Sequence, residues 1–104
     1  MLSSPTYNVM VVNRYLKNKP KDFSLQLNIV HTERAFFSTT INYNEYENSH
    51  HPYLTLYVPK GTKCLYLVPV NKVESEVLFP PSTQYILYEE DRSNGYPHYF
   101  GMII

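Results

Sequence analysis

The sequence predicts a mainly β fold, and three observations lead to that class. Apolar and polar residues alternate with a period of two along several segments, as in strands with one buried face. Turns rich in proline and glycine separate these segments. Eleven tyrosines and no tryptophan suit the half-buried surface of a sheet. Helix is expected only for a turn or two around residues 43–48, and the 104 residues are expected to form a single domain, residues 1–104.

The predicted strands follow one another along most of the chain. The clearest alternation runs through residues 23–29, where Phe23, Leu25 and Leu27 are apolar and the residues between them are polar. Residues 7–16 are assigned to a strand because β-branched residues disfavour a helix there. Further strands are expected at residues 53–58, 64–68, 77–79, 84–88 and 99–104. Turns are expected at residues 59–61, 80–82 and 94–95, and the longest loop at residues 41–52.

Composition excludes several classes of function. Nine basic and nine acidic side chains cancel, so no strong field favours nucleic acid or an anionic membrane. The N-terminal residues lack the pattern of a signal peptide, and no apolar run approaches the ~20 residues that span a bilayer. These features predict a cytoplasmic protein or one delivered to a host cell. Cys64 is the only cysteine and is expected to be a buried strand residue, so no disulfide and no metal site are predicted.

The segment Glu74-Ser75-Glu76, followed by an apolar run and a proline pair, is the most informative motif. Residues i and i+2 of a strand project from the same face, so two like charges would stand side by side. Taken alone, Glu74 and Glu76 could be solvated surface glutamates. Two further motifs accompany them: Phe37-Ser38-Thr39-Thr40 upstream, and the turn Pro59-Lys60-Gly61-Thr62 between.

In chain order the motifs are an arginine at the end of the first strand (Arg14), Ser-Thr-Thr, and Glu-x-Glu. This order resembles the arginine–serine–glutamate class of ADP-ribosyltransferases, in which Ser-Thr-Ser usually stands where this chain has Ser-Thr-Thr. The resemblance covers residues 34–90 well and residues 7–16 loosely. It implies an α+β family fold with two packed antiparallel or mixed sheets around an NAD cleft.

Family domains usually carry helices before the first strand, whereas only six residues precede Tyr7 here. Most of the N-terminal helical part is therefore expected to be lacking. A reduced enzyme, a partner or second copy of the chain that completes the cleft, and a loss of catalysis are three explanations that the sequence leaves open.

The resemblance implies transfer of ADP-ribose from NAD to an arginine of an acceptor protein, with release of nicotinamide. NAD is then a substrate, and no metal is required. Two alternatives stay open. An NAD glycohydrolase would let water replace the acceptor, and a non-catalytic module derived from the same fold would bind NAD or a protein partner.

The implied catalytic residues are Glu76, Glu74 and Ser38. Glu76 would stabilise the positive charge that develops on the ribose, as carboxylates do in glycoside hydrolysis. Glu74 would orient the acceptor, because a guanidinium pairs well with a carboxylate. The hydroxyl of Ser38 would hold Glu76 in one rotamer from an adjacent strand.

The implied dinucleotide-binding residues are Arg14, Ser38, Thr39, Thr40 and Tyr43. Arg14 would hold a phosphate or ribose, and Tyr43 would stack on nicotinamide from the loop. Each role has a structural competitor. The hydroxyls could bond local backbone, and Arg14 could be a surface arginine in a basic segment. Arg34 is a rival for the phosphate role.

Overall fold

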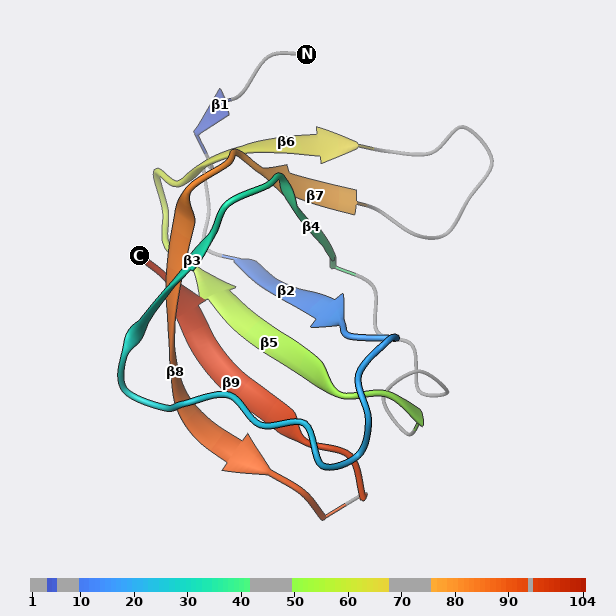
Figure 1. The fold of residues 1–104 in the computed structure, drawn as a ribbon. Coiled ribbons are helices and arrows are strands. Elements are labelled where there is room, and N and C mark those ends of the chain that lie inside the picture. The colour runs from blue at the N-terminus through green and yellow to red at the C-terminus, as the bar shows by residue number, and fades with distance from the viewer. Residues whose placement is uncertain (1–3, 6–9, 42–49, 68–75, 94) are drawn as a thin grey trace.

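The computed structural model describes residues 4–5, 10–41, 50–67, 76–93 and 95–104. The described residues form nine β-strands, shown in Figure 1: β1 (Ser4–Pro5), β2 (Met10–Tyr15), β3 (Val30–Glu33), β4 (Phe37–Thr40), β5 (Tyr53–Val58), β6 (Lys63–Leu67), β7 (Glu76–Phe79), β8 (Thr83–Asp91) and β9 (His98–Ile103). The mainly β class is therefore confirmed. In this part of the chain no helix is long and apolar enough to cross a membrane.

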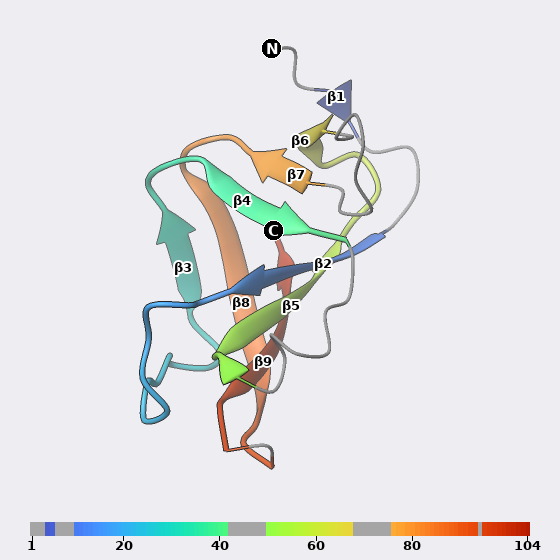
Figure 2. The same cartoon turned by 90° about the vertical axis from the view of Figure 1, so that its right-hand side faces the viewer.

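The strands are hydrogen-bonded in one continuous order, β1-β6-β7-β4-β2-β5-β9-β8-β3. The sequence predicted two packed sheets, and the two layers are instead the two ends of this one sheet, which curls over itself (Figures 1 and 2). Three strands separate β4 from β8 in the order, yet the rings of Phe37 and Tyr85 stack with centroids 5.3 Å apart. The turning point is the contact between β2 and β4, where only Asn13 and Thr40 pair in register.

The core lies inside the curl, on the face that alternate strand residues present to it. Its fully buried side chains come from six strands: Val12, Phe37, Leu54, Leu56, Val58, Val77, Phe79, Leu87, Tyr99 and Ile103. Because this face contains Val12, Phe37 and Val77, their neighbours Asn13, Ser38 and Glu76 lie on the opposite face of the sheet.

Strands β8 and β9 approach each other closely at Gly101. A Cβ atom at this position would lie 2.1 Å from the carbonyl oxygen of Ile86. The register also shifts here by a bulge between Leu87 and Glu89. A glycine is thus required by contact with the neighbouring backbone, and not by an unusual dihedral angle.

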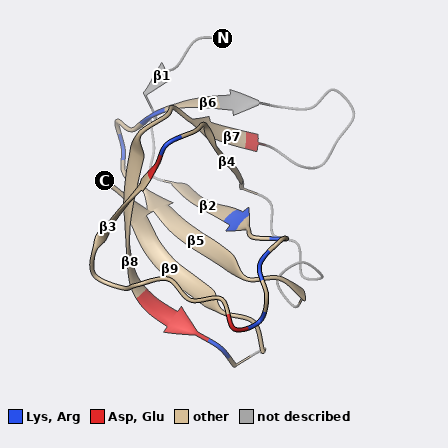
Figure 3. Ribbon diagram, viewed as in Figure 1, with Lys and Arg blue, Asp and Glu red and all other residues tan. Residues whose placement is uncertain are grey.

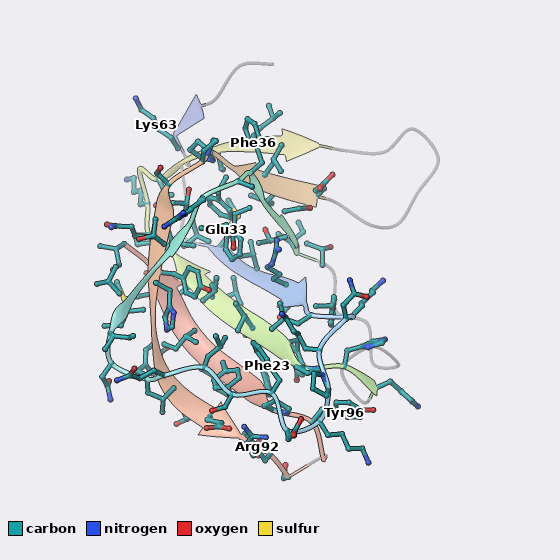
Figure 4. All side chains as sticks on the ribbon, viewed as in Figure 1. Phe23, Glu33, Phe36, Lys63, Arg92 and Tyr96 are labelled. Carbon is teal, nitrogen blue, oxygen red and sulfur yellow. The ribbon has the colours of Figure 1, made fainter. Side chains whose placement is uncertain are left out.

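The strand predicted at residues 23–29 is wrong. Burial does alternate there, with Phe23, Leu25 and Leu27 partly buried, but the segment joins no ladder. Its backbone is instead held by the Leu25 N–H, which donates to the Tyr99 hydroxyl at 2.9 Å, and by Arg92, which donates to the Phe23 carbonyl at 2.8 Å (Figure 4). The alternation indicated which side chains face the core. The backbone bonds to side chains of β9 and of the loop after β8, and the Asn28 N–H donates to the main-chain carbonyl of Leu87 on β8 at 2.7 Å, without forming a ladder.

The other predicted strands, and the turns at residues 59–61 and 80–82, are found with small shifts at their ends. The helical turn predicted at residues 43–48 and Asn94 of the predicted turn 94–95 lie outside the described residues. Gly61, with φ +91°, forms the predicted turn after β5, and Ser82, with φ +70°, forms the corner between β7 and β8. Cys64 is a buried residue of β6, as predicted. The strand β3 was not predicted, because Val30 is the one apolar residue among residues 30–33 and no apolar–polar alternation marks the segment.

Candidate active site

Ser38 and Glu76 lie on neighbouring antiparallel strands, and the Ser38 hydroxyl donates a hydrogen bond to Oε2 of Glu76. Glu76 is the first residue of β7, and Ser38 is the second residue of β4. The contact that the sequence predicted between these two side chains is therefore present. A hydroxyl that donates to one carboxylate oxygen restricts the rotamer of the carboxylate and leaves its other oxygen available to a ligand.

Arg14 lies on the next strand, β2, where β2 and β4 diverge. Its Nη1 donates to the main-chain carbonyl of Ser38 at 3.0 Å, and its guanidinium carbon lies 4.8 Å from the centre of the Phe37 ring. Figure 3 shows this basic position at the end of β2 and the acidic start of β7. Arg14 thus reaches the backbone of the residue whose side chain holds Glu76. Its rival Arg34 is exposed in the connection between β3 and β4.

Of the four remaining predicted residues, the structure describes Thr39 and Thr40. Thr39 is turned to the core, where its hydroxyl donates to the carbonyl of Val77 at 2.8 Å, so the prediction that it binds the dinucleotide is corrected. The reason is strand alternation, which sends Thr39 to the face opposite Ser38 and Thr40. Thr40 stands directly opposite Glu76 in the register. Glu74 and Tyr43 lie outside the described residues, and their roles stay predictions.

A cavity of about 430 Å³ lies at the other end of β7 from Glu76. It is lined by the turn at residues 59–63, by Pro80, by residues 82–84 and by Ile103 and Ile104. None of the predicted site residues that the structure describes lines it. We therefore place the candidate site at the Ser38–Glu76 pair, on the strength of its chemistry, and not at this cavity.

A second set of polar side chains near the pair was not anticipated from the sequence. The Thr55 hydroxyl on β5 donates to Oδ1 of Asn13 at 2.8 Å and contacts Nε2 of His98 on β9 at 2.7 Å. The three residues come from three adjacent strands, and each hydrogen-bonded pair is far apart in the chain: 42 positions separate Asn13 from Thr55, and 43 separate Thr55 from His98. No local spacing connects them, so no sequence signal could have found them without the register of β2, β5 and β9.

His98 is enclosed by aromatic rings. Its ring stacks on Tyr53 with centroids 3.6 Å apart and lies 4.0 Å from Phe100. Burial lowers the pKa of His98 to about 4, an effect that the nearby Asp91 carboxylate opposes. The imidazole is therefore neutral at physiological pH, with one N–H donor and one acceptor nitrogen.

Over the described ranges, no group of three or more histidine, cysteine, aspartate or glutamate side chains is arranged to hold a metal ion. The chemistry available at the candidate site is that of a carboxylate with a fixed rotamer, on a face that also carries amide and hydroxyl groups. The guanidinium of Arg14 comes from the opposite face of β2, which it shares with Val12, and it reaches the site at the main-chain carbonyl of Ser38. Such a site can stabilise a developing cation, and its guanidinium can bind an anion.

Solved structures with similar folds were found, although no curated protein sequence matches the chain. C3larvin toxin, an ADP-ribosyltransferase from Paenibacillus larvae, shares 18% identity with a TM-score of 0.73, over 97% of this chain and 64% of the toxin. C3stau2 from S. aureus, solved with NAD, shares 17% identity with a TM-score of 0.77, over 96% and 64%. The ATR domain of Salmonella SpvB shares 23% identity with a TM-score of 0.67, over 91% and 62%.

These likenesses establish the fold, and they show that this chain spans less than two thirds of each of these three relatives. The sequence itself carries the family assignment. The profile of the ADP-ribosyltransferase exoenzyme family matches residues 2–95, which is most of the chain and includes all the motifs discussed above. The chain therefore belongs to the ADP-ribosyltransferase exoenzyme family.

Proposed function

We propose that this protein transfers ADP-ribose from NAD to an arginine side chain of an acceptor protein and releases nicotinamide. The observation that carries the proposal is the hydrogen bond from Ser38 to Glu76 on adjacent strands, within a fold and family of ADP-ribosyltransferases. A glutamate with a fixed rotamer is the group that cleavage of a glycosidic bond requires beneath the sugar.

In the proposed reaction the bond between nicotinamide nitrogen and ribose C1′ breaks, and its electron pair leaves with nicotinamide, which becomes neutral. The ribose then carries positive charge, which the Glu76 carboxylate stabilises. A guanidinium nitrogen of the acceptor forms the new bond to C1′ and loses a proton. Ser38 contributes by keeping the Glu76 carboxylate in place throughout.

Arg14 is proposed to bind a phosphate of the dinucleotide. One of its nitrogens is committed to the Ser38 carbonyl, and within the described residues its other N–H groups have no hydrogen-bond partner. The bond and the contact with the Phe37 ring hold the guanidinium in a defined position. The remaining donors of a planar guanidinium match a phosphate well.

Specificity for arginine is proposed from Glu74, the first glutamate of the Glu-x-Glu motif. By resemblance to the family, this carboxylate faces the acceptor, where it would pair with a guanidinium. The proposal separates the two glutamates by role: Glu76 serves both cleavage and transfer, and Glu74 serves transfer alone.

The test is to incubate the purified protein with NAD labelled on the ADP-ribose, with polyarginine as the acceptor, and to measure nicotinamide release and labelling together. Labelled acceptor supports the transferase. Nicotinamide without label indicates a glycohydrolase, and NAD binding without either product indicates a binding module.

Variants sharpen the assignment. Glu76→Gln should reduce both products on the order of 10²–10³-fold, because it removes the stabilising charge. Glu74→Gln should preserve nicotinamide release and lower labelling. Glu89→Gln, at an exposed carboxylate on β8, is the matched control and should change neither. Equal loss of both activities in both motif variants would contradict the division of roles.

A further inference from the structure

Asn13 lies on the same face of the sheet as the candidate catalytic pair. Glu76 stands directly opposite Thr40, Thr40 opposite Asn13, and Asn13 opposite Thr55. Residues directly opposite each other in an antiparallel ladder project from the same face. The four side chains therefore form one row across β7, β4, β2 and β5.

The hydrogen bonds of Thr55 fix the orientation of the Asn13 amide. A hydroxyl has one proton, and Thr55 donates it to Oδ1 of Asn13. Thr55 must then accept from Nε2 of His98, which carries the proton of the neutral ring. The chain of donors runs from His98 through Thr55 to the Asn13 oxygen, so this oxygen is satisfied.

The amide nitrogen of Asn13 is different. Asn13 is only 9% exposed, yet its two N–H groups have no hydrogen-bond partner anywhere in the described part of the chain. More than nine in ten buried polar groups in proteins are bonded, and leaving one unpaired destabilises the folded protein. The oxygen and nitrogen of an amide diverge from one carbon. Bonding the oxygen to Thr55 on β5 therefore turns the nitrogen away from β5.

We propose that Asn13 binds the ligand directly, and that its N–H groups donate to the carboxamide oxygen of the nicotinamide half of NAD. The proposal rests on the proposed function and assigns to it a further binding residue. Thr55 and His98 act through Asn13 as positioning residues.

Charge and spacing favour this acceptor. An amide N–H is a neutral donor suited to a neutral carbonyl oxygen, whereas the phosphates have the guanidinium of Arg14 available. Asn13 lies two strands from Glu76, a separation of about 10 Å at the usual strand spacing. A ligand whose ribose meets Glu76 and whose base extends along the row toward β2 would bring the carboxamide to Asn13.

The test measures the affinity of the whole chain for NAD and for ADP-ribose, which lacks nicotinamide, by calorimetry. Asn13→Asp keeps an oxygen for Thr55 and replaces the donor nitrogen with an acceptor. It should weaken NAD binding about tenfold or more and leave ADP-ribose binding unchanged. Thr55→Val should weaken NAD binding in the same selective way, because the amide loses its anchor. Asn18→Asp adds the same charge at an exposed position in the turn after β2 and should change neither affinity.

A third ligand tests the acceptor atom. The 3-acetylpyridine analogue of NAD keeps the carbonyl oxygen and lacks the amide nitrogen, so the wild-type protein should bind it as well as NAD. A folded Asn13→Asp protein with unchanged NAD affinity overturns the inference and leaves the proposed function standing. Equal weakening of NAD and ADP-ribose overturns it as well, because a merely structural role would affect both. If the wild-type protein does not bind NAD, the proposed function fails and the inference falls with it.

Discussion

Replacing Ser38 by alanine tests the link between structure and chemistry most directly. The substitution removes the donor to Glu76 and nothing from the core, since Ser38 is exposed on the face opposite Phe37. A hydrogen bond to a charged group contributes about 1.5–3 kcal/mol, which corresponds to about 10- to 100-fold in rate if it is needed in the transition state. Because the side chain is exposed, the expected loss in nicotinamide release lies near the lower end of this range.

The assay is nicotinamide release as a function of NAD concentration, combined with thermal unfolding. Ser38→Ala should lower kcat with little change in KM, and its unfolding free energy should stay within about 0.5 kcal/mol of wild type. Ser38→Thr keeps a hydroxyl and should retain most of the activity. Ser24→Ala, at an exposed serine of the 23–29 segment, serves as the control. Full activity in Ser38→Ala, or equal loss in the alanine and threonine variants, would refute the reasoning.

Three further predictions concern other parts of the fold. Gly101→Ala should destabilise the protein by about 3 kcal/mol, measured by urea unfolding, because the added Cβ meets the Ile86 carbonyl; wild-type stability would contradict this close approach. The free energy of unfolding should fall as the pH drops from 6.5 toward 4, and it should not depend on His98 above pH 7. Burial lowers the pKa of His98 to about 4, so the unfolded chain takes up the proton at a higher pH than the folded protein does. After allowance for partial exposure the effect is about 1–2 kcal/mol, and it should vanish in His98→Phe. Arg14→Lys should weaken NAD binding in calorimetry, because a point charge does not replace a guanidinium fork; unchanged affinity would leave Arg14 with a structural role only.

The candidate site shows how far sequence reasoning reached. Motif order placed Ser38 beside Glu76, and the structure contains that hydrogen bond. The same reasoning listed Thr39 as a ligand residue because it treated Ser-Thr-Thr as a unit. A strand divides such a unit between its two faces, and Thr39 packs in the core.

The sequence by itself determined the mainly β class, most of the strands, and the turns at Gly61 and Ser82, because alternation and turn chemistry are local properties. Only the tertiary structure decided that the sheet is continuous and curls at the contact of Asn13 with Thr40. It also decided that residues 23–29 join no ladder and bond to the side chains of Tyr99 and Arg92, with one backbone hydrogen bond from Asn28 to Leu87 of β8. The physical reason is that a hydrogen-bond partner depends on the register between strands distant in the chain, and no pattern within one strand contains that register.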